Sequence, residues 1–140
     1  MFQPKSIDFS KTTVYSARSR TNLVNIANLR TPGAQPDNLF QSPEFDILVE
    51  KLNQAKVAKK TVTCFIGAHV IKCGLSRYLI WLMEHGYITH LASNGAGSIH
   101  DFELAYLGGT SEYVPTAIED GSFGMWEETG RWMNEAIRQG

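Results

Sequence analysis

The sequence predicts an α/β fold, a Rossmann-like parallel sheet flanked by helices, which is incomplete as it stands. Two β-branched apolar runs, at 61–66 and 87–92, alternate with helical patterns in the order helix, strand, helix, strand, helix, helix. Strands that alternate with helices imply parallel pairing and right-handed crossovers. A glycine-containing segment follows each run before the next helix, as at the ligand-binding edge of such sheets.

Two parallel strands alone make a poor sheet, so the fold needs more than these two runs. Further strands could lie within residues 7–29, where Thr12–Tyr15 is one candidate. Alternatively, the chain needs a partner, or it is the front part of a longer protein. The predicted division is an N-terminal arm and loop over 1–41 and a Rossmann-like domain over 42–140. The loop within the arm is TPGAQPDN.

The first predicted helix starts at Ser42-Pro43-Glu44, which supplies a capping hydroxyl, a first-turn proline and an early acid. Its apolar residues fall at i, i+3, i+4 and i+7: Phe45, Leu48, Val49 and Leu52. The run 61–66 then predicts a buried strand. A loop, GAHVIKCG, leads from this strand to a second helix over 75–85.

The second strand, 87–92, leads through small residues to a predicted helix over 99–107, closed by Gly108-Gly109. Ser98 and Asp101 fit a capping box at its start. A short helix is expected in TSEYVPTAIEDG. The final stretch places Met125, Trp132, Met133, Ala136 and Ile137 on roughly one helical face.

Charge and composition exclude several classes of function. The chain has 140 residues, with 13 Lys and Arg against 14 Asp and Glu. No basic stripe indicates nucleic acid, and no apolar run is long enough to span a bilayer. The two cysteines, Cys64 and Cys73, lie in or beside apolar stretches, which favours reduced, buried thiols and a cytoplasmic location. A disulfide remains an alternative.

The two small-residue turns are the candidate ligand site. SNGAGSIHD follows the second predicted strand, and GAHVIKCG follows the first. Glycine lets a backbone approach a ligand closely, and a helix start offers free N–H groups to phosphate. Such turns also occur for purely conformational reasons, and the strict G-x-G-x-x-G spacing is absent.

Residues 64–104 resemble the front half of deoxyhypusine synthase. In that family a small-residue loop and a helix lead to a strand of the form hydrophobic-T-T-(A/G)-G-G, followed by an acidic pair and an aspartate. Here Ser93-Asn94-Gly95-Ala96-Gly97 stands at the glycine segment and Asp101 at the aspartate. Ile99-His100 replaces the acidic pair, and no motif matches the family's nucleophilic lysine region.

The resemblance implies an NAD-binding fold and a homo-oligomer. It also implies transfer of an aminobutyl or related amine group from a polyamine to a protein lysine, with this chain supplying the dinucleotide-binding half. Two alternatives stay open. One is a non-catalytic nucleotide-binding or oligomerising module. The other is a Rossmann-like enzyme that uses Lys72 and His100 on a phosphorylated small molecule.

The candidate catalytic residues are His100, for proton exchange with an amine, and Asp101, for orienting a ligand hydroxyl or ammonium. Helix capping is the alternative for Asp101, and Glu103 is a possible second carboxylate. No metal site is predicted, since the chain has no C-x-x-C or H-x-x-x-H pair. The candidate cofactor-binding residues come from both turns: Gly67, His69, Lys72, Gly74, Ser93, Asn94, Gly95 and Gly97.

Overall fold

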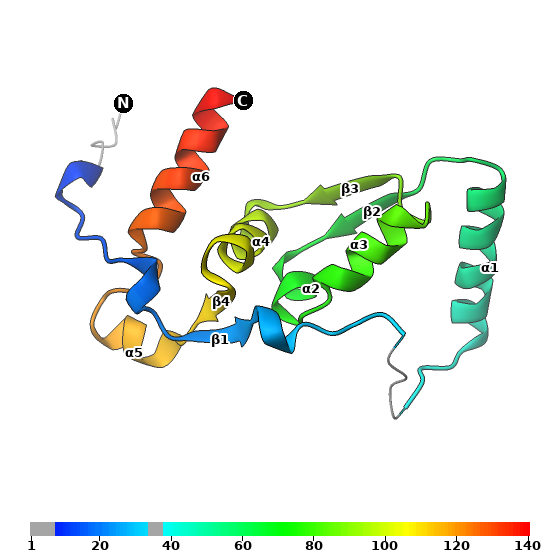
Figure 1. Cartoon of the computed structure of the whole chain (residues 1–140), viewed down its shortest axis with the longest axis horizontal. Helices are drawn as coiled ribbons and strands as arrows, with labels where there is room; N and C mark the ends of the chain where they lie inside the picture. Colours follow the sequence, from blue (N-terminus) through cyan, green and yellow to red (C-terminus); the bar gives the residue numbers. More distant parts are fainter. Residues whose placement is uncertain (1–7, 34–37) are drawn as a thin grey trace, which may run out of the picture. The chain divides into compact units, whose positions relative to one another are not determined.

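A computed structural model describes residues 8–33 and 38–140, which form two compact units (Figure 1). One unit is continuous, Asn22–Ser111, and the other combines the chain up to Thr21 with Glu112–Gly140. These boundaries differ from the predicted division at 41/42. Residues 1–7 of the predicted arm and 34–37 of the predicted loop TPGAQPDN lie outside the described residues.

The chain is a mixed α/β protein, as the sequence predicts, and its strands are short. The described elements of the continuous unit are β1 (Asn22–Asn25), a 3-10 turn (Ile26–Asn28), α1 (Pro43–Val57), β2 (Thr63–Ile66), α2 (Ala68–Lys72), α3 (Ser76–Glu84), β3 (His90–Ser93) and α4 (Gly95–Leu107). The first three residues of β4 (Gly109–Glu112) belong to it as well, and Glu112 belongs to the other unit.

The predicted parallel pair is present as β2 and β3. Their register pairs Thr63 with His90 and Ile66 with Ser93, so both strands end at the same edge. The core lies on one face of β2. It is built from four buried side chains, which come from α2, α3, the segment before β3, and α4: Ile71, Leu79, Ile88 and Leu104. The half-buried Cys64 and Ile66 of β2 pack against them.

The second sheet pairs β1 with β4. A further strand is thus present within 7–29 at Asn22–Asn25, but it does not extend the β2–β3 sheet, and Thr12–Tyr15 contributes only an isolated bridge from Tyr15 to Trp126. In the described part of the chain both sheets have two strands, so the α/β class is confirmed and an extended Rossmann-like sheet is not seen.

Helix α1 begins where the sequence predicts, because Ser42 Oγ accepts a hydrogen bond from Phe45 N at 3.1 Å and Pro43 occupies the first turn. Its predicted apolar face stays largely exposed. Phe45 retains 45% of its accessible surface and Leu48 retains 51%. A helix that buries so little gains little from tertiary packing, so its capping and propensity contribute more of its stability.

The discontinuous unit contains two 3-10 turns (Phe9–Lys11 and Ala17–Ser19), α5 (Val114–Glu119) and α6 (Glu127–Gln139). Backbone hydrogen bonds connect its two sequence segments: Tyr15 N donates to Met125 O and Glu127 N donates to Tyr15 O, both at 2.8 Å. An i, i+4 ion pair lies on α6, with Arg131 Nε 2.5 Å from Glu127 Oε1.

Both cysteines are free thiols, but Cys73 is exposed, so the expectation of two buried thiols is wrong for Cys73, which caps the end of α2. None of the helices in the described residues has the length and apolar character that a bilayer crossing requires.

Candidate functional site

The first predicted turn is largely helical. Gly67 caps the start of α2 without a side-chain hydrogen bond, and the five residues from Ala68 to Lys72 form the helix. The prediction of a loop over 67–74 is therefore wrong, because a single apolar turn is too short to show a helical period. The residue at the sheet edge is Gly67, while Lys72 lies at the far end of α2.

The second turn is shorter than predicted, because α4 starts at Gly95 and not at Ile99. Asn94 is the N-cap, and its Oδ1 accepts a hydrogen bond from Gly97 N at 3.0 Å. The predicted Ser98–Asp101 capping box is therefore wrong. Asparagine is among the best capping residues, and it satisfies one of the helix-start amides.

The glycines of this turn have different roles. A Cβ at Gly95 would meet nothing within 4 Å, whereas a Cβ at Gly97 would overlap Ser93 Oγ. Gly97 is buried and lets the start of α4 pack against the end of β3. Gly95 leaves open space at the rim, where a ligand could approach the backbone.

The two turns lie side by side on one edge of the β2–β3 sheet. Ile66 pairs with Ser93, so the residues that follow them, Gly67 and Asn94, leave the sheet at the same edge. The position of a Cβ on Gly67 is 3.7 Å from Asn94 Nδ2. The two turns are therefore adjacent, as predicted, and the residues that lie together at this edge are Gly67, Asn94 and Gly95.

The remaining candidates of the first turn lie away from this rim. Gly74 has φ +76°, and its Cβ position is 3.5 Å from Asn28 O and from Leu29 Cα. Its carbonyl accepts a hydrogen bond from Arg30 N at 2.9 Å. Gly74 therefore serves a tight turn that packs against the chain after β1. His69 is exposed on α2.

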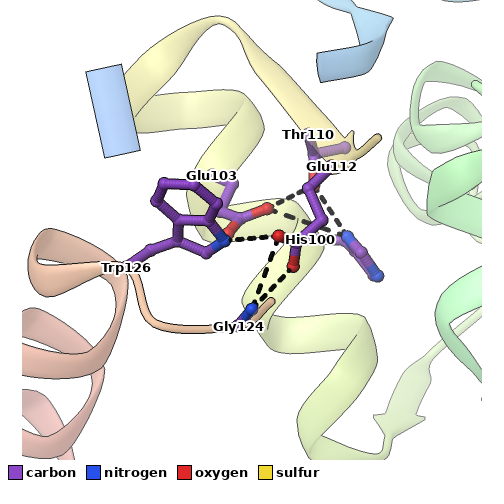
Figure 2. A network of polar contacts seen from close by, with 6 residues as sticks. All are labelled: His100, Glu103, Thr110, Glu112, Gly124 and Trp126. Atoms are coloured by element: carbon purple, nitrogen blue, oxygen red, sulfur yellow. Dashed lines mark hydrogen bonds and ion pairs between the residues drawn. The ribbon is translucent and has the colours of Figure 1, made fainter. Parts of the chain in front are cut away.

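His100 belongs to a buried polar cluster of the same unit, which Figure 2 shows with its dashed contacts. His100 Nδ1 lies 2.7 Å from Thr110 Oγ1, and Thr110 Oγ1 donates to Glu103 Oε2 at 2.5 Å. Glu103 is 2% exposed and Thr110 is fully buried. The sequence indicates Glu103 only as a possible second carboxylate, and nothing in it points to Thr110.

This cluster determines the proton placement on His100. Thr110 has one hydroxyl proton, which it donates to Glu103 Oε2, so His100 Nδ1 is the donor to Thr110 Oγ1. In the neutral imidazole, Nε2 then carries the lone pair. Thr110 and Glu103 thus position the ring of His100 in one tautomer, as a carboxylate does for a histidine base. Asp101, by contrast, is exposed on the surface of α4.

The discontinuous unit holds polar residues that sequence analysis missed. Glu112 Oε2 accepts a hydrogen bond from Trp126 Nε1 at 2.8 Å, and Gly124 N donates to Glu112 Oε1 at 3.1 Å (Figure 2). Glu128 accepts from Ser16 Oγ and Ala17 N, both at 2.6 Å. These bonds lower the pKa of the Glu128 carboxyl, with the Ser16 hydroxyl contributing most. Partners 12 to 112 residues apart in the chain carry no local sequence signal.

No family model matches the chain, and neither the curated proteins nor the solved structures give a match. Within residues 8–33 and 38–140, no group of three or more His, Cys, Asp or Glu side chains could hold a metal ion. The case for a function therefore depends on the sheet edge and on the polar clusters themselves.

Proposed function

We propose that the Asn22–Ser111 unit binds the phosphates of a dinucleotide, NAD, at the paired turns of β2 and β3. The wider activity we propose is that of a deoxyhypusine synthase-like transferase of an aminobutyl or related amine group. The observation that carries the dinucleotide site is the approach of Gly67 to Asn94, 3.7 Å from the glycine's Cβ position to Asn94 Nδ2. The amine chemistry rests on the sequence resemblance.

The start of α4 suits a phosphate for three reasons. The amides of Gly95 and Ala96 have no carbonyl four residues back within the helix, so they are available to a ligand or water. The 13-residue helix also places the positive end of its dipole there. Finally, a Cβ at Gly95 would have no neighbour within 4 Å, so an anion has room to reach the backbone.

NAD, when bound, supplies a hydride acceptor for the oxidation of an amine. In this proposal His100 exchanges a proton with the amine through Nε2, since Nδ1 is committed to Thr110. Glu103 and Thr110 are positioning residues, because they act only through the histidine ring. The proposed partners are a polyamine and a protein lysine acceptor.

The test is NAD binding to the full chain, measured as a rise in melting temperature and by calorimetry. A ligand at about 100 times its Kd stabilises the folded state by about 2.7 kcal/mol. Gly95→Val fills the open space at the rim and should abolish the shift. Gly130→Val is the matched control, since Gly130 is also a helical glycine with no atom within 4 Å of its Cβ position. Equal NAD binding in both variants would refute the site.

The second candidate is a nucleotide-binding or oligomerising module without catalysis, and exposed apolar surface favours it. Phe65 of β2 is 82% exposed on the sheet face opposite the core. Parallel sheets are ordinarily covered on both faces, so this one calls for a covering partner. Light scattering during size-exclusion chromatography tests the oligomerising form of this candidate: Phe65→Lys should shift a homo-oligomer towards the monomer, and a monomeric wild-type chain would contradict that form.

A further inference from the structure

A small polar hollow lies wholly within the discontinuous unit, between the turn at residues 19–21 and the segment 112–126. Its volume is about 170 Å³. A water molecule occupies about 30 Å³ in the liquid, so the hollow has room for roughly five or six waters. Sites for drug-sized ligands occupy about 300–1,000 Å³, so a dinucleotide is far too large for it.

Charged groups of both signs line this hollow. Arg20 supplies a guanidinium whose Nη2 atom is buried, and Glu112 and Asp120 supply carboxylates. The two carboxylates therefore outnumber the one cation. A ligand that carries both an anionic and a cationic group can pair with each sign at once, whereas a simple anion would meet two like charges.

The two carboxylates are held in place by neighbouring donors. Glu112 accepts hydrogen bonds from Trp126 Nε1 at 2.8 Å and from Gly124 N at 3.1 Å, as Figure 2 shows. Asp120 Oδ1 accepts from Ser122 N at 2.9 Å. Hydrogen bonds from Ser122 hold the pKa of the Asp120 carboxyl below its ordinary value, so it is ionised at neutral pH. Such prior ordering reduces the entropy lost on binding.

The guanidinium is ordered as well. The Arg20 Cζ atom lies 5.4 Å from the centroid of the Trp126 ring, which is within the range of a cation–π contact. Trp126 is itself fixed by its bond to Glu112 and by the bridge of its backbone to Tyr15. One aromatic ring thus orders the cation and one of the anions, and sets their separation.

We propose that this hollow binds a free α-amino acid, with its carboxylate at Arg20 and its ammonium group at Asp120 and Glu112. The size excludes larger ligands, and the mixed charge selects a zwitterion over a simple acid or a simple amine. This site is independent of the dinucleotide proposal, because it is formed by the other unit and by none of the residues at the β2–β3 rim.

The test adds each standard amino acid to the full chain at about 10 mM, which nearly saturates a site with a Kd of about 1 mM. At least one should raise the melting temperature by about 4 °C. Acetate and ethylamine, each carrying one of the two charges, should give much smaller shifts. The absence of any amino-acid response, or an equal response to acetate or ethylamine alone, would overturn the proposal.

Variants then locate the site. Asp120→Asn keeps the acceptor for Ser122 N but removes the charge, and Arg20→Gln removes the cation. Each should weaken amino-acid binding about tenfold or more, because a hydrogen bond to a charged group contributes roughly that factor. Arg131→Gln, on exposed α6, is the matched control and should bind as the wild type does. Unchanged binding in both site variants would place the ligand elsewhere.

A measurement on the wild-type chain tests the proposal even if the variants fail to fold. In a two-dimensional amide NMR spectrum, the binding amino acid should shift the signals of Ser122 and Gly124, whose N–H groups hold the two carboxylates. Shifts confined to residues 22–111 would contradict the proposal.

Discussion

The contact of Gly97 with Ser93 gives a quantitative test of how the rim is built. A Cβ at Gly97 would overlap Ser93 Oγ and would lie 3.4 Å from Ser93 Cβ. Gly97→Ala therefore forces the Ser93 hydroxyl out of its place, where it donates to Asn94 O at 3.2 Å. Loss of that hydrogen bond costs about 1 kcal/mol, and an off-rotamer side chain costs about 0.5–1.5 kcal/mol more.

Removing the hydroxyl should reverse the sign of the effect. In a Ser93→Ala background only the 3.4 Å contact with Cβ remains, and alanine is intrinsically favoured over glycine in a helix by about 1 kcal/mol. Gly97→Ala should thus destabilise the wild type by about 1 kcal/mol and stabilise the Ser93→Ala variant by about 0.5–1 kcal/mol. The expected coupling energy is about 1.5–2 kcal/mol.

The assay is urea unfolding of the four members of this double-mutant cycle, followed by circular dichroism. The wild type and Ser93→Ala serve as the paired references, so errors common to both backgrounds cancel. A coupling energy below about 0.5 kcal/mol would refute the packing of α4 against the end of β3, because that is the scatter expected for independent sites.

Three further outcomes follow from single side chains. Asn94→Ala should cost about 1 kcal/mol through the lost cap, whereas Asn94→Asp should keep the melting temperature and abolish the NAD shift, because a carboxylate there repels phosphate; retained NAD binding would count against the site. Glu128→Gln should cost about 1 kcal/mol at pH 7. Because the folded pKa of Glu128 is lowered by Ser16, the stabilisation is present above the unfolded pKa of about 4.3 and is lost as pH falls through the lower folded value. The difference in melting temperature between the two proteins should therefore shrink as the pH falls below about 4.3, and a constant difference would contradict this. Glu103→Ala should cost about 3 kcal/mol in urea unfolding, since it leaves buried Thr110 without its acceptor, and a cost below about 0.5 kcal/mol would rule out that role.

Local chemistry predicted the helix that starts at Ser42 and the strand over 61–66, which the structure forms over 63–66, because a cap followed by proline and a β-branched run are both short-range signals. The start of α4 was not predicted because the two glycines of Gly95-Ala96-Gly97 have low helix propensity. In the structure Asn94 caps this segment, and Gly97 is required there because Ser93 occupies the space of a side chain.

The strand β4, Gly109–Glu112, was missed for a different reason. Its residues are small and polar, so the segment lacks the β-branched apolar pattern of a strand, yet the first three are buried. Thr110 is buried because it bonds to Glu103, seven residues away on α4. A buried polar strand of this kind depends on hydrogen bonds to residues on other elements, so neither hydrophobic periodicity nor strand propensity predicts it.

The most direct test of the dinucleotide site is a titration of the full chain with NAD, followed by amide NMR. The account predicts the largest shifts at Gly67, Gly95 and Ala96, with Gly130 unmoved as the internal reference. Saturable shifts at the first three amides would support binding at the paired turns. The absence of shifts at the β2–β3 rim, at NAD concentrations up to about 10 mM, would contradict it.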